Sequence, residues 1–169
     1  GGTSLEVICI FVYVIMPPAI YPVNSLAIGG YYGSGFCRSR LSGEFIWQTD
    51  RHEADLLPAL NSRQIAAVGS LNDNLSAFFA PNGQKIGEYP SAAVFAVHGE
   101  SSWIARTENH VARLTSEGQE IWKRAITPRA LWSESQPIVD PAGRVYVATG
   151  NSILCLDATG AEIFSLPTG

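Results

Sequence analysis

The chain has 169 residues, of which 46% are hydrophobic and 15% charged, and its formal net charge is −4. This balance is typical of a compact, turn-rich globular protein and argues against a disordered chain. The 11 Lys and Arg residues form no basic stripe, so we expect no binding to nucleic acid through phosphate neutralisation.

The first 17 residues form an apolar segment. Its core, LEVICIFVYVIM from Leu5 to Met16, is shorter than the roughly 20 residues that a helix needs to span a bilayer. A secretory signal would carry a cation near its start, but the first cation of the chain is Arg38. We therefore predict no membrane span. We interpret residues 1–17 as containing a buried strand from a unit that precedes the first repeat, and the remnant of an export signal is the alternative.

From residue 18 to residue 169 the chain repeats one unit. Val145–Phe164 aligns without a gap on Trp103–Trp122, and the turn glycine of the unit recurs at spacings of 40, 35 and 42 residues. These glycines are Gly43, Gly83, Gly118 and Gly160. We predict four units, at approximately residues 18–50, 58–90, 94–124 and 137–165.

Each unit is predicted to contain four short β-strands. In the last unit the strands fall at Pro137–Val139, Arg144–Thr149, Ile153–Asp157 and Glu162–Ser165. They are rich in Val, Ile, Leu and aromatic residues, and turn-forming Gly, Asn and Pro residues separate them. No long segment has the apolar period of a helix. The sequence thus predicts an all-β fold, a β-propeller of about four four-stranded antiparallel blades.

An aromatic residue follows the turn glycine in three units, as Trp47, Trp122 and Phe164. The second unit has Gly87 at this position and Tyr89 two residues further on. Because a blade must cover both of its faces, we interpret these rings as packing between blades rather than as a ligand-stacking surface.

The last unit, VYVATGNSILCLDATGAEIF, resembles the pyrroloquinoline-quinone-type (PQQ-like) propeller repeat. The matching residues are Leu156, Asp157, Thr159, Gly160 and Phe164. The resemblance implies a propeller and is compatible with several functions, among them quinone-dependent dehydrogenases and a lipoprotein of the outer-membrane barrel-assembly machinery. The run from Asp140 to Ala148, DPAGRVYVA, also resembles metal-dependent lactone hydrolases of the gluconolactonase type.

The cofactor prediction depends on the cysteines. The PQQ-like dehydrogenases carry a vicinal Cys-Cys pair above the quinone and a calcium ion bound by Glu and Asn, whereas Cys9, Cys37 and Cys155 lie far apart. We therefore expect no cofactor, and PQQ with calcium only if the chain is a fragment of a dehydrogenase. Three buried thiols are favoured over one disulfide bond.

About four blades make only half of the ring that relatives close, and a half-ring leaves apolar faces uncovered. We expect a piece of a longer protein, a homodimer that completes the ring, or a four-bladed closure, in that order.

The predicted interaction face joins the turns between second and third strands to the links between blades. Its candidate residues are Asp50, Arg51, His52 and Glu53 in the first link, Asn109, His110 and Asn151 in the turns, and Arg129 and Trp132 in the third link. A lone histidine in a turn is usually solvated, and a cluster such as Asp50–Glu53 is usually a solvated loop. No catalytic, metal-binding or cofactor-binding residue is predicted.

The expected function is a non-catalytic propeller scaffold that binds a protein or peptide, in the periplasm or outside the cell as the resemblance implies. The alternative is a fragment of a quinone-dependent dehydrogenase or of a metal-dependent lactone hydrolase.

Overall fold

The computed structural model describes residues 19–21, 25–29, 36–40, 45–48 and 56–169. In the first sheet it describes the backbone of the strands and the side chain of Trp47. The apolar segment at residues 1–17 and the charged cluster Asp50–Glu53 therefore lie outside the described residues. So does Cys9, together with the side chain of Cys37.

Each predicted unit forms one four-stranded antiparallel sheet whose strands pair in chain order, which confirms the predicted fold class. The first two sheets contain β1 (Ala19–Tyr21), β2 (Ser25–Gly29), β3 (Phe36–Arg40) and β4 (Phe45–Gln48), then β5 (Ala59–Leu60), β6 (Ala66–Ser70), β7 (Leu75–Phe79) and β8 (Lys85–Tyr89). The last two contain β9 (Val94–His98), β10 (Ser102–Arg106), β11 (His110–Leu114) and β12 (Glu120–Ala125), then β13 (Ile138–Val139), β14 (Val145–Ala148), β15 (Ser152–Leu156) and β16 (Glu162–Pro167).

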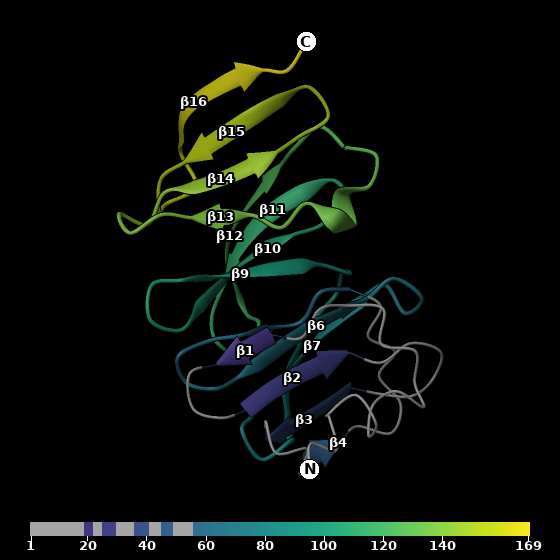
Figure 1. Ribbon diagram of the computed structural model, residues 1–169. Coiled ribbons are helices and arrows are strands. Elements are labelled where there is room, and N and C mark those ends of the chain that lie inside the picture. The colour runs from purple at the N-terminus through teal and green to yellow at the C-terminus, as the bar shows by residue number, and fades with distance from the viewer. Residues whose placement is uncertain (1–18, 22–24, 30–35, 41–44, 49–55) are drawn as a thin grey trace, which may run out of the picture.

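The four sheets fan out from a shared inner edge. The first strand of each sheet contacts the first strand of the next, β1 with β5, β5 with β9 and β9 with β13. From this edge each sheet extends outward to its fourth strand, and β16 lies at the far end of the molecule from β4 (Figure 1). Among the described residues, none lies in a helix that is both long enough and apolar enough to cross a membrane.

The turns between third and fourth strands explain the recurring glycine. In Ala80–Gln84, Thr115–Gln119 and Asp157–Ala161, the first N–H donates to the fifth carbonyl and the fourth N–H donates to the first carbonyl. The fourth residue is glycine in all three, with φ of +88°, +91° and +84°. Glycine adopts this left-handed backbone without the steric cost that a Cβ atom brings.

The outer aromatic residue of one sheet packs on the turn glycine of the next. The indole ring of Trp47 lies on Gly83, where a Cβ atom would be 2.6 Å from Trp47 Cγ, and its N–H donates to the Pro81 carbonyl at 3.0 Å. Trp122 repeats both contacts: it lies on Gly160 and donates to the Ala158 carbonyl at 3.0 Å. These contacts confirm the interpretation of both rings as packing.

The second sheet lacks this aromatic residue, and side chains from elsewhere replace it. A Cβ atom at Gly87 would lie 1.8 Å from the Glu117 carbonyl oxygen, so β8 approaches the next turn too closely for a ring. Phe78 covers Gly118 instead. Trp103 of β10 donates its indole N–H to the Ser116 carbonyl at 3.1 Å, the group that corresponds to the carbonyls bound by Trp47 and Trp122.

The largest apolar cluster lies between the second and third sheets. Its centre is formed by the fully buried rings of Phe78, Phe95 and Trp103, whose centroids lie 5.5 to 6.2 Å apart. Edge-to-face and tilted ring pairs of this kind add about 1 kcal/mol each to the free energy of burial. This cluster holds β7 of the second sheet against β9 and β10 of the third.

The last sheet is covered on one face only. Its inward residues, including Val145 and Leu156, pack against Ile104 and Val111 of the third sheet. On its other face, β13, β15 and β16 leave four apolar side chains exposed: Ile138 (66%), Ile153 (41%), Phe164 (38%) and Leu166 (55%). Cys155 pairs in register with Tyr146 and Phe164 and is a buried free thiol, as predicted for this cysteine.

Candidate functional site

A hollow of about 290 Å³ lies where loops from several sheets meet. It is lined by the β6–β7 turn, the β8–β9 link, the β10–β11 turn and one residue of the β12–β13 link. The lining residues are Leu71, Asn74, Ser91, Ala92, Thr107, Glu108, Asn109 and Trp132. Four described loops of the predicted interaction face thus line one concave surface, and the β14–β15 turn does not.

A threonine shapes the β10–β11 turn at the edge of the hollow. Thr107 Oγ1 accepts a hydrogen bond from the His110 N–H and lies 3.2 Å from the His110 carbonyl. Thr149 makes the same contacts with Ser152 in the last sheet. Hydroxyl-to-backbone bonds of this kind stabilise tight turns. The identity of Thr107 and Thr149 in the repeat therefore has a structural cause and does not mark a catalytic group.

His110 is buried behind the hollow and is not a solvated turn residue. Its Nδ1 is a hydrogen-bond partner of Thr107 Oγ1 at 2.8 Å and of Asn109 Oδ1 at 3.0 Å. Its Nε2 is a partner of the Tyr89 hydroxyl at 2.8 Å, and that hydroxyl also donates to Glu120 at 3.2 Å. The imidazole thus joins the β10–β11 turn to the outer strand of the second sheet.

Burial dominates the titration of this network. It lowers the pKa of His110, with Lys123 acting in the same direction and Glu120 opposing it. Burial, followed by the charge of Glu120, raises the pKa of Tyr89 above its ordinary value. A neutral imidazole beside a neutral phenol is therefore the form that the folded chain favours near pH 7.

Arg106 lies beneath the hollow and was not predicted from the sequence. It is fully buried at the end of β10, on the face that meets the last sheet. It donates to the carbonyls of Thr107, Glu108 and Ala148, and the Trp132 ring covers its guanidinium at 5.9 Å. Arg106 aligns with Ala148 in the repeat, so this departure from the unit was the available signal.

The structure brings together some of the predicted face residues and separates others. Asn109 and Trp132 line the hollow, and His110 lies behind it. Arg129 is exposed on the β12–β13 link, close enough to influence Arg106 electrostatically. Asn151 is exposed in the β14–β15 turn and does not line the hollow.

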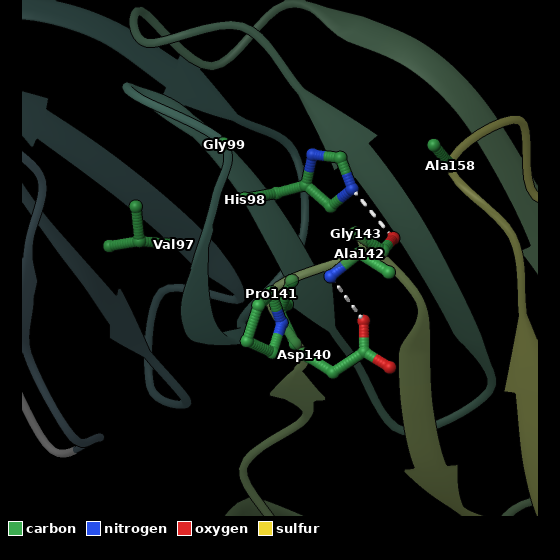
Figure 2. A pocket seen from close by; sticks show the side chains of 9 residues that line it. Val97, His98, Gly99, Asp140, Pro141, Ala142, Gly143 and Ala158 are labelled. Carbon is green, nitrogen blue, oxygen red and sulfur yellow. Dashed lines mark hydrogen bonds between the residues drawn. The ribbon is translucent and has the colours of Figure 1, made fainter.

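A larger hollow, about 500 Å³, opens at the turns between first and second strands (Figure 2). Its polar groups already bind one another. His98 Nε2 lies 3.0 Å from the Gly143 carbonyl, and Asp140 accepts hydrogen bonds from the backbone of Ala142 and from Arg144. The DPAG run thus closes its own turn.

The sequence predicted no metal-binding residue. Within the part of the chain that the structure describes, no three His, Cys, Asp or Glu side chains gather in a way that could hold a metal ion.

Solved structures with the same arrangement of sheets are propeller-type proteins. Virginiamycin B lyase from Staphylococcus aureus matches with a TM-score of 0.71 at 13% identity, over 89% of this chain and 54% of that one. The WD40 domain of Toxoplasma gondii coronin matches with a TM-score of 0.70 at 15% identity, over 90% and 45%. A gluconolactonase from Xanthomonas campestris matches with a TM-score of 0.58 at 13% identity, over 90% and 61%.

The fold is that of a β-propeller. The chain spans about half the length of these structures, 45% to 61%, so it forms part of such a ring. No family model matches the chain. No curated protein matches it. The likeness at this level of identity extends to the propeller fold and not to one of its functions.

Proposed function

We propose that this partial propeller is a non-catalytic scaffold that binds a protein or peptide segment at the 290 Å³ hollow. The observation that carries the proposal is the meeting of four loop segments around one concave surface, with Trp132 as its aromatic wall. Aromatic side chains in such positions are common anchors for a bound partner. Trp132 packs against the buried cluster of Leu56, Ala92 and Val94, which ties this wall to the sheets beneath.

Two features of the proposal rest on the PQQ-like resemblance of the last unit. We place the protein in the periplasm or outside the cell, and we assign it no cofactor. The rival proposal is a fragment of a quinone-dependent dehydrogenase or of a metal-dependent lactone hydrolase, and a gluconolactonase is among the similar folds. The titratable set of His110, Tyr89 and Glu120 does not favour the rival, because Thr107 and Asn109 already bind the imidazole on the side of the hollow.

A peptide selection tests the binding function. A library of random 12-residue peptides displayed on phage is selected against the purified chain, and enriched peptides are measured by fluorescence anisotropy. We expect Trp132→Ala to weaken binding at least tenfold, because the ring is the largest apolar surface of the hollow. Pro141→Ala, in the larger hollow, is the matched control and should leave the affinity unchanged.

The opposite outcome would favour an enzyme. Selected peptides that ignore Trp132, together with EDTA-sensitive hydrolysis of dihydrocoumarin or PQQ-dependent reduction of a dye, would overturn the scaffold proposal.

We also propose that a second copy of the chain covers the open face of the last sheet. The aromatic-on-glycine contacts pair Trp47 with Gly83 and Trp122 with Gly160, and among the described residues Phe164 lies on no turn glycine. In the repeat, Gly43 is the turn glycine of the first unit. Two chains joined head to tail would place Phe164 of each chain beside the first unit of the other, and they would supply about the length of the similar structures.

A further inference from the structure

Arg106 occupies an unusual electrostatic position. Its guanidinium is fully buried between the third and last sheets, and its hydrogen-bond partners are three backbone carbonyls. None of the ion pairs among the described residues includes it. Carbonyl dipoles compensate a buried cation only in part, and an unpaired buried charge costs several kcal/mol.

One donor of this guanidinium has no partner. Arg106 Nε is buried and makes no hydrogen bond, although such groups are almost always satisfied in folded proteins. Burial, and then the positive charge of Arg129, lower the pKa of Arg106 to about 10. Because Glu108 also lines the hollow, the feature that suits an anion is the free N–H of a buried guanidinium and not the net charge of the hollow.

The Arg106 guanidinium contacts residues that line the hollow. Two of its carbonyl partners belong to Thr107 and Glu108, which line the hollow, and Trp132 both lines the hollow and covers the guanidinium. The ring is therefore one of the groups that lie between Arg106 and the hollow.

Trp132 packs against the buried cluster of Leu56, Ala92 and Val94 and lies over Arg106. It begins a single 3-10 turn, Trp132–Glu134, whose preceding residue, Leu131, has φ of +57° and no side-chain capping bond. Leu131 is 68% exposed. A leucine in the left-handed region is strained, so a movement of this turn that relaxes Leu131 offsets part of the packing that Trp132 loses.

We propose that Arg106 binds a carboxylate group of the ligand, which accepts a hydrogen bond from Nε–H when Trp132 moves aside. The inference rests on the proposed function, since it names the chemistry that the same hollow recognises. The ligand is a peptide segment that presents a carboxylate, from its C-terminus or from Asp or Glu. Arg129, exposed on the adjacent link, supplies a second positive charge at the entrance.

The test observes the free donor directly. Arginine Nε–H cross-peaks of the full chain are recorded by ¹H–¹⁵N NMR and assigned by through-bond correlation, which needs no variant. N-acetylglycine is the carboxylate probe, N-acetylglycinamide its neutral match, and N-acetylaspartate amide the probe for a side-chain carboxylate. Arg144 Nε, which already donates to Asp140 at 2.6 Å, is the internal control.

We expect the Arg106 cross-peak to shift saturably with either carboxylate, at least tenfold more weakly with the amide, and the Arg144 cross-peak to stay in place. The stronger of the two carboxylates identifies the source. Trp132→Ala should tighten binding of these small probes at least threefold, because the covering ring is gone. An unmoved Arg106 cross-peak, an equal response to the amide, or an unchanged affinity in Trp132→Ala would each overturn the proposal.

The two proposals fail differently. Peptides that bind through Trp132 while the Arg106 cross-peak stays unmoved would preserve the scaffold and remove the carboxylate site. A carboxylate-dependent shift of Arg106 without any selected peptide would preserve the site and remove the scaffold.

Discussion

The turn glycines combine a left-handed backbone with close contact to an aromatic ring, and matched substitutions separate the two contributions to stability. Gly160 has φ of +84° and carries the Trp122 ring, with a Cβ position 2.8 Å from Trp122 Cδ2. Gly99 has φ of +63° and nothing within 4 Å of its Cβ position. We expect Gly99→Ala to lower the free energy of unfolding by about 1 kcal/mol, from backbone strain alone. Gly160→Ala should cost about 2 kcal/mol more, because the ring must also shift.

Urea unfolding of both variants measures the difference. Equal losses for Gly99→Ala and Gly160→Ala would mean that the Trp122 contact contributes nothing to the role of the glycine.

The buried imidazole of His110 makes stability depend on pH. Its pKa is lower in the folded chain than in the unfolded chain, where it is ordinary and near 6.5. Below about pH 6.5 the unfolded chain thus binds the extra proton, and the stabilising contribution is lost as the pH falls toward the folded pKa. Between pH 7 and pH 5 we expect the free energy of unfolding of the natural chain to fall more steeply than that of His110→Asn. One proton limits the difference to about 1.4 kcal/mol per pH unit.

Parallel pH profiles of the natural chain and His110→Asn would contradict this expectation. The sequence offered no basis for it, because burial of His110 depends on Tyr89 and Glu120 from two other strands.

At the scale of strands and turns, local chemistry made most of the fold predictable. The predicted strands of the last unit differ from β13–β16 by at most two residues at any end. Turn glycines, Asn and Pro fix these ends through the backbone of a few neighbouring residues, so a single sequence contains the required information. The recurring identities Thr107 and Thr149 belong to the same class, since both cap a turn.

The exceptions depend on contacts between sheets. Gly87 breaks the aromatic pattern because the Glu117 carbonyl occupies the space, and Trp103 of the next sheet supplies the indole N–H instead. Arg106 replaces an alanine of the repeat because Ala148 and Trp132, distant in sequence, surround it. Neither exchange can be derived from the local sequence, because each partner lies in another unit.

A tryptophan at the outer aromatic position should therefore destabilise the second sheet strongly and the last sheet little. We expect Gly87→Trp to lower the free energy of unfolding by more than 4 kcal/mol or to prevent folding, since its Cβ alone would overlap the Glu117 backbone. Phe164→Trp occupies the same position of the unit in the last sheet, where the face is open, and should change stability by less than 1 kcal/mol. Thermal unfolding of both variants provides the measurement. A tolerated Gly87→Trp would show that β8 can move away from the turn.

For the whole molecule, the sequence predicted four blades and an incomplete ring, and the exposed face of the last sheet shows where the ring is open. Ile138, Ile153, Phe164 and Leu166 form an apolar surface of the kind that monomeric proteins rarely expose. We expect the natural chain to sediment as a dimer and Phe164→Glu to shift it toward monomer by at least tenfold in the dissociation constant. Ile121→Glu, at an exposed position of β12, adds the same charge away from this face and should leave the dimer intact.

Analytical ultracentrifugation over a range of concentrations distinguishes the outcomes. A natural chain that stays monomeric, or a Phe164→Glu variant that dimerises as well as Ile121→Glu, would exclude the second copy as the cover of this face.

The packing of Trp122 on Gly160 of the following sheet limits how the number of blades in such a chain can change. The packing unit does not coincide with one sheet. It extends from the outer aromatic ring of one sheet, across the link, to the turn glycine of the next sheet. A recombination at the sheet boundaries would preserve every strand. It would still disrupt the ring-on-glycine contact wherever the new neighbouring sheet had a bulkier residue in place of the turn glycine. We therefore expect a duplication that adds a blade, or a deletion that removes one, to preserve this packing where the incoming turn keeps that glycine.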